Sequence, residues 1–125
     1  MEIQWFSKSL QGIATIYETN ITLNTVASSY FKNAFATLVG FNKQENILLI
    51  KALNKEEVSL GNYSPTDLHD ISIKPSYGRL NGKGIIKKIS EFFPMDFEKK
   101  KLYKFCCSWD ESNKYLKIYL EEEIK

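Results

Sequence analysis

The sequence predicts an α+β fold, in which duplicated strand-helix-strand-strand units form one small, mostly antiparallel, pseudo-twofold β-barrel with two short helices. Residues 103–121 can be laid on residues 35–53 without a gap, and both stretches read as two strands joined by a polar turn. A stripe of apolar residues at helical spacing precedes each hairpin, and a β-rich run precedes each stripe. Each half is therefore expected to run strand, strand, short helix, strand, turn, strand.

The two halves of the internal repeat share the positions of aromatic, polar and aliphatic residues, but few identical residues. Leu48 and Leu116 are one identical pair, and Ile50 and Ile118 are the other. An aromatic residue nevertheless opens both hairpins, another precedes both turns, and an aliphatic strand follows each turn. A tandem repeat of this kind can build within one chain a barrel that single-copy proteins build as dimers.

The domain organisation follows from the repeat. A chain of 125 residues is long enough for one hydrophobic core. We expect a single domain over 1–125, with repeats at about 13–53 and 71–121. A polar, turn-rich linker at 54–70 joins them, and residues 64–67 suit a short helical turn within it.

The first repeat is expected to open with a β-rich run over 13–24 that bends at Thr19 and Asn20 into two short strands. Asn24 and Thr25 both suit a helix N-cap. Apolar residues at helical spacing then predict a helix of about ten residues over 25–34. Because so short a helix is marginal alone, it must pack against the sheet.

The second repeat is expected to follow the same plan. Its β-rich run covers 71–82 and is broken at 74–75 by a lysine and a proline. A helix follows over 82–93 and ends at Pro94, because proline cannot continue a helix. An inserted loop at 95–101 precedes the second hairpin, and a tail of glutamates closes the chain.

Alternation along the hairpins predicts the core. In the first hairpin one face of the leading strand holds Phe35, Thr37, Val39 and Phe41. The return strand has Leu48, Ile50 and Ala52 on one face and Ile47, Leu49 and Leu53 on the other, which indicates a strand buried on both sides, as in a small barrel or at a dimer contact. In the second hairpin the residues that face one way and meet across the strands are Tyr103, Phe105, Cys107, Trp109, Leu116, Ile118 and Leu120. Cys106 and Cys107 are strand neighbours that point to opposite faces, so a bond between them would be strained. We expect both thiols to be reduced, as is usual in the cytosol.

Bulk composition limits the function classes. Hydrophobic residues make up 43% and aromatic residues 14% of the chain, which is typical of a globular protein. The net charge of +2 does not by itself imply a nucleic-acid or membrane partner. The sequence shows no apolar run of signal-peptide or membrane-spanning length, so we expect a cytoplasmic protein without a membrane partner.

Two fragments carry a family resemblance. Residues 21–24 (ITLN) stand where a short strand enters a helix, and residues 38–41 (LVGF) lead into a hairpin. In this order they resemble the swapped-hairpin modules of the AbrB/SpoVT type, and two such modules in one chain resemble MraZ. The second half is also similar to small uncharacterised proteins of Gram-positive bacteria that share the plan. The resemblance implies a bacterial DNA-binding transcription regulator.

A basic patch in the second repeat is the best functional candidate in the sequence. It comprises Lys74, Arg79, Lys83, Lys87 and Lys88. Lysines close together on a helix suit contacts to DNA phosphates, and an arginine can read a guanine edge with two hydrogen bonds. The alternative is a solvated helix face, which is what runs of charge usually are.

The sequence is also compatible with two other functions, the binding of a small ligand and the binding of a protein. Strand-helix-strand-strand units used twice also resemble GyrI-like domains, which imply a cleft for an amphipathic ligand between the halves. Aromatic residues expected in loops or on outer faces could line such a cleft or a protein interface, with self-association as one outcome. These residues are Trp5, Phe6, Tyr17, Tyr63 and Tyr77.

Enzyme chemistry finds little support in the residues. The single histidine, His69, lies beside carboxylates but has no second ligand at a sensible spacing, so it is interpreted as a solvated linker residue. The lone run at 82–84 (GKG) lacks the P-loop pattern and is interpreted as a tight turn into a helix, with phosphate binding as the alternative. We expect no enzyme activity, no cofactor and no metal.

Overall fold

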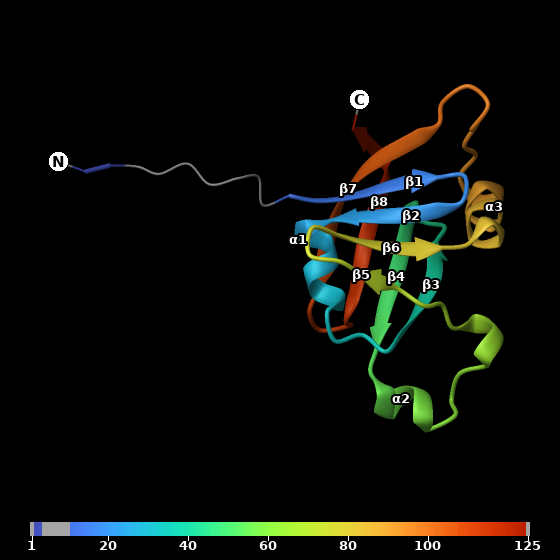
Figure 1. Cartoon of the computed structure of the whole chain (residues 1–125). Coiled ribbons are helices and arrows are strands. Elements are labelled where there is room, and N and C mark those ends of the chain that lie inside the picture. Colours follow the sequence, from blue (N-terminus) through green and yellow to red (C-terminus); the bar gives the residue numbers. More distant parts are fainter. Residues whose placement is uncertain (1, 4–10, 125) are drawn as a thin grey trace.

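The computed structural model describes residues 2–3 and 11–124, which form a curled, half-barrel sheet of eight antiparallel strands with three short α-helices (Figure 1). The strands follow one another across the sheet in the order β3 (Ala36–Asn42), β4 (Ile47–Leu53), β8 (Tyr115–Ile124), β7 (Leu102–Asp110), β1 (Gly12–Tyr17), β2 (Asn20–Asn24), β6 (Tyr77–Asn81) and β5 (Ser72–Ile73). The expected small, mostly antiparallel α+β fold is therefore confirmed in outline.

The first helix is shorter than the sequence predicts. Helix α1 covers Thr25–Ser28 and tightens into a 3₁₀ turn, η1 (Ser29–Phe31), so the expected ten-residue helix is wrong. Asn24 caps it as expected, since its side-chain oxygen accepts the Ala27 N–H at 3.0 Å. The helix is cut short where serine hydroxyls bond to the preceding backbone carbonyls, because such bonds compete with regular helical pairing.

The second half follows the predicted order closely, with one exception. The break between β5 and β6 and the helix α3 (Lys83–Phe92) lie where the sequence puts them. The glutamate-rich end is not a free tail, because β8 runs to Ile124 and pairs Glu123 with Phe105. Glu123 also forms an ion pair with Lys100 of the inserted loop, which helps to hold the end of the strand.

The linker contains a helix that the sequence analysis missed. Helix α2 spans Lys55–Ser59 and starts with a capping box, in which the side chains and backbone N–H groups of Asn54 and Glu57 bond reciprocally. None of its residues is buried, so no apolar stripe revealed it. The expected short helical turn is present as η2 (Pro65–Asp67).

Helices cover the two ends of the barrel, and Figure 1 shows α1 and α3 at opposite ends of β1, β2 and β6. At the α1 end, Phe31 is fully buried and meets the Trp109 ring edge-on at 5.5 Å. At the α3 end, Ile86 and Ile89 are buried in the same core. Most residues that were expected to share faces of the two hairpins pack in or against this core. Thr37 is buried, whereas Phe35, which precedes β3, is 53% exposed. Ile47 and Leu53, on the other face of β4, are buried as well.

One short stretch of backbone joins the two edges of the curled sheet. His69 exchanges two hydrogen bonds of 2.9 Å with Thr37 on β3, and the Thr37 hydroxyl donates to the same His69 carbonyl at 2.8 Å. Three residues later, Ser72 and Ile73 pair with β6 at the far side of the sheet. Residues 69–73 therefore link the two edges, and His69 is a half-buried closing residue, not the solvated linker residue expected from sequence.

We expect Thr37→Val to lower the free energy of unfolding by about 1 kcal/mol, because it removes one buried hydrogen bond and preserves the shape of the side chain. Urea denaturation measures this change. The matched control is Thr66→Val, whose hydroxyl is exposed and which should change stability by less than about 0.5 kcal/mol. Equal stabilities for wild type and Thr37→Val would contradict the role of this hydroxyl in closure.

Candidate binding groove

The residues of the predicted basic patch are all exposed, but they do not form one face. Lys74 lies in the turn between β5 and β6, and Arg79 lies on β6 with its guanidinium carbon 5.2 Å from the centre of the Tyr77 ring. The three lysines come from α3. Among the described residues, the side chains of this set form no ion pair with a carboxylate.

Helix geometry divides the three lysines of α3. Successive residues of an α-helix are about 100° apart around its axis, so Lys83 and Lys87 are separated by about 40°. Lys88 lies about 100° from Lys87 and faces the direction of Ile85. Consistent with this, Lys88 lines a large surface hollow with Ile85, and Lys83 and Lys87 do not.

The large hollow lies between the hairpin β3–β4 and the junction of β6 with α3, and we call it the β3–α3 groove. Its volume is about 1020 Å³. Its lining residues are Leu38, Val39, Gly40, Phe41, Leu48, Leu49, Lys51, Tyr63, Thr66, Asp67, His69, Asn81, Gly82, Gly84, Ile85, Lys88, Ile89, Phe92 and Tyr115.

The wall of the groove nearest the core is apolar. Val39 and Phe41 project from β3 toward the core, and α3 contributes Ile85 and Ile89 opposite them. The Phe92 ring stacks on the Phe41 ring, with centroids 5.2 Å apart and planes 20° from parallel. Phe92 remains 38% exposed, so this aromatic pair presents apolar surface to the groove.

The groove passes over the edge of β3. Four consecutive residues, 38–41, line it, although successive side chains of a strand point to opposite faces. A wall that includes both faces of a strand must also include the strand's edge. The backbone of β3 is therefore part of the lining.

That edge presents unpaired backbone groups. The N–H and C=O of Thr37 point away from β4, since both bond to His69. Along an antiparallel strand, the N–H and C=O groups of successive residues point alternately to one neighbour and to the other. Val39 and Phe41, two and four residues after Thr37, therefore also direct these groups away from β4. Within the described part of the chain, neither residue has a backbone hydrogen bond at that edge.

Polar residues of the linker form the outer wall. Tyr63, Thr66, Asp67 and His69 line the groove on the side away from the core. Lys51 also lines it and donates a 2.6 Å hydrogen bond to the Asn113 carbonyl. The groove thus combines an apolar inner wall with a polar outer wall.

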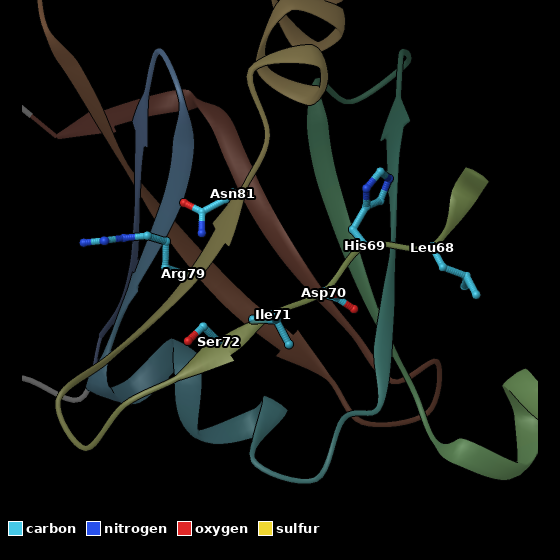
Figure 2. Close-up of a pocket in the computed structure, with 7 residues that line it drawn as sticks. All are labelled: Leu68, His69, Asp70, Ile71, Ser72, Arg79 and Asn81. Atoms are coloured by element: carbon cyan, nitrogen blue, oxygen red, sulfur yellow. The ribbon is translucent and has the colours of Figure 1, made fainter. Parts of the chain in front are cut away.

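A second hollow, of about 490 Å³, adjoins the groove through His69 and Asn81. Figure 2 shows that its polar side chains do not converge: Arg79 extends from β6 away from His69, and Asp70 points in another direction again. A catalytic acid, base and nucleophile need hydrogen-bond contact, and these residues lack it. Across the described residues, no group of three or more His, Cys, Asp or Glu side chains is placed to hold a metal ion.

Sequence reasoning found only parts of the groove. It put Val39 and Phe41 on one face of a strand and Lys88 in a DNA contact, and it named Tyr63 among candidate cleft aromatics. Of the other cleft candidates, Trp5 and Phe6 lie outside the described residues. Tyr17 is half-buried, and the ring of Tyr77 lies beneath the Arg79 guanidinium. The unpaired edge has no signature in the sequence, because it depends on where the linker leaves β3.

Comparisons with known proteins give no relative for this chain: no family model, no curated protein and no solved structure matches it. Over the described residues, the helices are all too short or too polar to cross a membrane.

Both cysteines are free thiols, as expected, and Cys107 is buried in the core. Burial, together with the neighbouring Cys106, raises the pKa of the Cys107 thiol from 9.0 to about 12. The folded protein therefore keeps this thiol neutral at pH values where an unfolded chain would ionise it. Cys107 is a structural residue, since the reactive form of a cysteine is the thiolate.

We expect the free energy of unfolding to fall as the pH rises from about 9 toward 12, because ionisation of Cys107 favours the unfolded chain over this range. The contribution of this thiol is complete below pH 9, and its slope cannot exceed about 1.4 kcal/mol per pH unit. Urea titrations at several pH values measure it. Cys107→Ala should show a shallower decline, and parallel curves for the two proteins would contradict the raised pKa.

Proposed function

We propose that this protein is a non-enzymatic binding protein that takes an apolar or amphipathic ligand in the β3–α3 groove. The observation that carries the proposal is the apolar inner wall of a hollow of about 1020 Å³ beside the edge of β3. Ligand sites are usually concave and largely apolar, with a few polar groups at fixed places.

The aromatic pair of Phe41 and Phe92 supports this proposal. Apolar surface contributes roughly 25 cal/mol for each Å² removed from water. The exposed part of Phe92 and its stacked partner therefore offer favourable burial to an apolar ligand group. Lys43 holds its ammonium 5.0 Å from the centre of the Phe92 ring, which puts a cation beside the apolar contact and suits an amphipathic ligand.

We further infer that the groove lies between two copies of one ancestral unit, as in a duplicated pseudo-twofold barrel. The order strand, strand, helix, strand, strand occurs on each side of the linker. The two hairpin turns also agree, because Asn46 and Lys114, 68 positions apart, have positive φ angles of 54° and 57°. The β3–β4 wall belongs to the first unit, and the β6–α3 wall belongs to the second.

A second candidate function is duplex DNA binding by an AbrB-like transcription regulator in the bacterial cytoplasm. It is favoured by the exposed lysines of α3, which lack carboxylate partners among the described residues. Lys74, Lys83, Lys87 and Lys88 would contact phosphates, and Arg79 would contact a base edge after leaving Tyr77. This candidate does not use the apolar wall of the groove, which is why we place it second.

The groove proposal predicts that Phe92→Glu weakens binding of anilinonaphthalene sulfonate, an amphipathic fluorescent probe, by about tenfold through loss of apolar contact. Fluorescence titration measures the affinity, and thermal unfolding with and without probe checks it independently. Leu60→Glu is the matched control, because Leu60 is 74% exposed and does not line the groove. Failure of the wild type to bind the probe would refute the proposal.

The DNA candidate predicts that wild type binds mixed duplex DNA at low salt and that affinity falls steeply as salt rises. Replacing Lys83, Lys87 and Lys88 by glutamate should reduce affinity by at least about tenfold, since each phosphate contact is lost. Fluorescence anisotropy measures both effects.

A control with the same change of charge replaces exposed lysines outside α3, Lys32, Lys55 and Lys104, by glutamate. If the two triple variants lose the same DNA affinity, the effect is due to net charge, and the hypothesis of a specific contact through α3 is wrong. Absence of binding by wild type at low salt would remove the DNA candidate altogether.

A further inference from the structure

The two junctions that complete the barrel are paired to very different extents. Strand β1 pairs with β7 through six residue pairs, from Gly12 with Cys107 to Tyr17 with Leu102. The junction at the other side of the sheet joins β3 to the stretch before β5, and it has the single bridge between Thr37 and His69. The β3–α3 groove begins where this pairing stops.

The missing pairing lies along β3 beyond Thr37. The stretch 69–73 bonds to β3 at His69 and reaches β6 only at Ser72 and Ile73. Residues 69–73 run antiparallel to β3, so the residues before His69 would continue along Val39 and Phe41 if they stayed extended. They instead form η2 and leave the edge. An extended chain added beside this edge would lie about 4.8 Å from β3, in line with the stretch that begins at His69.

The backbone that faces this gap is equipped to bind a strand. Val39 and Phe41 each direct an N–H and a C=O into it, and these groups have no protein partner in the described part of the chain. Extended peptides add to free strand edges through such groups. A small apolar ligand would leave them without a hydrogen-bond partner while removing them from water, which is unfavourable.

The side chains that line the groove indicate which residues an added peptide strand would need. Alternate residues of an added strand would point toward the apolar wall of Ile85, Ile89 and Phe92, and the intervening residues would point toward Leu38 and Tyr63. Both sides favour β-branched or aromatic residues. The groove is lined by two lysines, Lys51 and Lys88, and by one carboxylate, that of Asp67. Acidic residues at the ends of the peptide would therefore complement the positive charge of the groove.

We propose that the natural occupant of the groove is an extended segment of a partner protein, rich in β-branched and aromatic residues and flanked by acidic ones, which pairs antiparallel with Val39 and Phe41 on β3. This inference rests on the proposed function and names its ligand class. A second copy of this chain fits less well, because its β3 would bring the paired strand β4 and its own groove walls against this edge, whereas a single extended segment brings only itself.

The first experiment uses a fluorescein-labelled peptide of alternating valine and phenylalanine residues with glutamates at both ends. Two N-methylated versions each remove the N–H groups along one edge of the peptide. Binding by anisotropy is expected for the parent peptide, and one methylated version should bind at least about tenfold more weakly. Hydrogen exchange measured by NMR should show slowed exchange at the Val39 and Phe41 amides when the parent peptide is bound.

Two variants test the edge and the charge separately. Val39→Pro removes an N–H group that does not bond to β4. Edge strands tolerate proline at such a position. The substitution should weaken peptide binding by about tenfold, because the peptide loses a hydrogen bond. Val39→Thr keeps the N–H and is the matched control. Lys88→Glu should weaken the glutamate-flanked peptide and strengthen a lysine-flanked one, so the inference stays testable if Val39→Pro does not fold.

The outcomes separate this inference from the proposed function. If anilinonaphthalene sulfonate binds but no peptide does, the groove binds ligands and strand addition is overturned. If both methylated peptides bind as well as the parent, strand addition is overturned as well. If the Val39 and Phe41 amides become protected with rising protein concentration and without peptide, the occupant is a second copy. If neither probe binds, both proposals fail.

Discussion

The hydrogen-bonded bridge between Thr37 and His69 is the constraint on which the rest of this structure depends. An open curled sheet leaves two edges with unpaired backbone groups, which is unfavourable unless the edges are covered or joined. Here a stretch of five residues, 69–73, joins them, reaching β3 at one end and β6 at the other. The Thr37 side chain is fully buried and reinforces the bridge with a third hydrogen bond.

Closure by a single bridge has a direct consequence for function. It brings the edges together at the level of Thr37 and leaves β3 unpaired beyond it. Helix α3 then has two tasks, since Ile86 and Ile89 complete the core and Ile85 and Phe92 face the opening. The groove is thus a product of incomplete pairing in an otherwise regular sheet. A fully paired junction, like that of β1 with β7, would have filled it.

The same helix explains why the charged and apolar features of this chain are close together. Lys88 lies next to the apolar positions of α3 around the helix axis, whereas Lys83 and Lys87 lie farther round. A ligand in the groove would therefore meet a cation at the rim of an apolar wall. This arrangement gives Lys88 a role in either proposed function, and it separates that residue from the other members of the basic patch.

The sequence by itself determined the order of the elements, the two hairpins and most of the core. Period-two alternation in 35–53 and 103–121 reports local backbone geometry, so the residues that share a face, such as Val39 with Phe41 and Phe105 with Cys107, could be predicted without a structure. Only the tertiary structure decided the role of His69 and the existence of the groove. Both depend on where residues 69–73 meet β3, which is a contact between segments far apart in the chain and leaves no periodic signal. Helix α2 escaped prediction for a related reason, because it buries none of its residues and its capping box alone marks it.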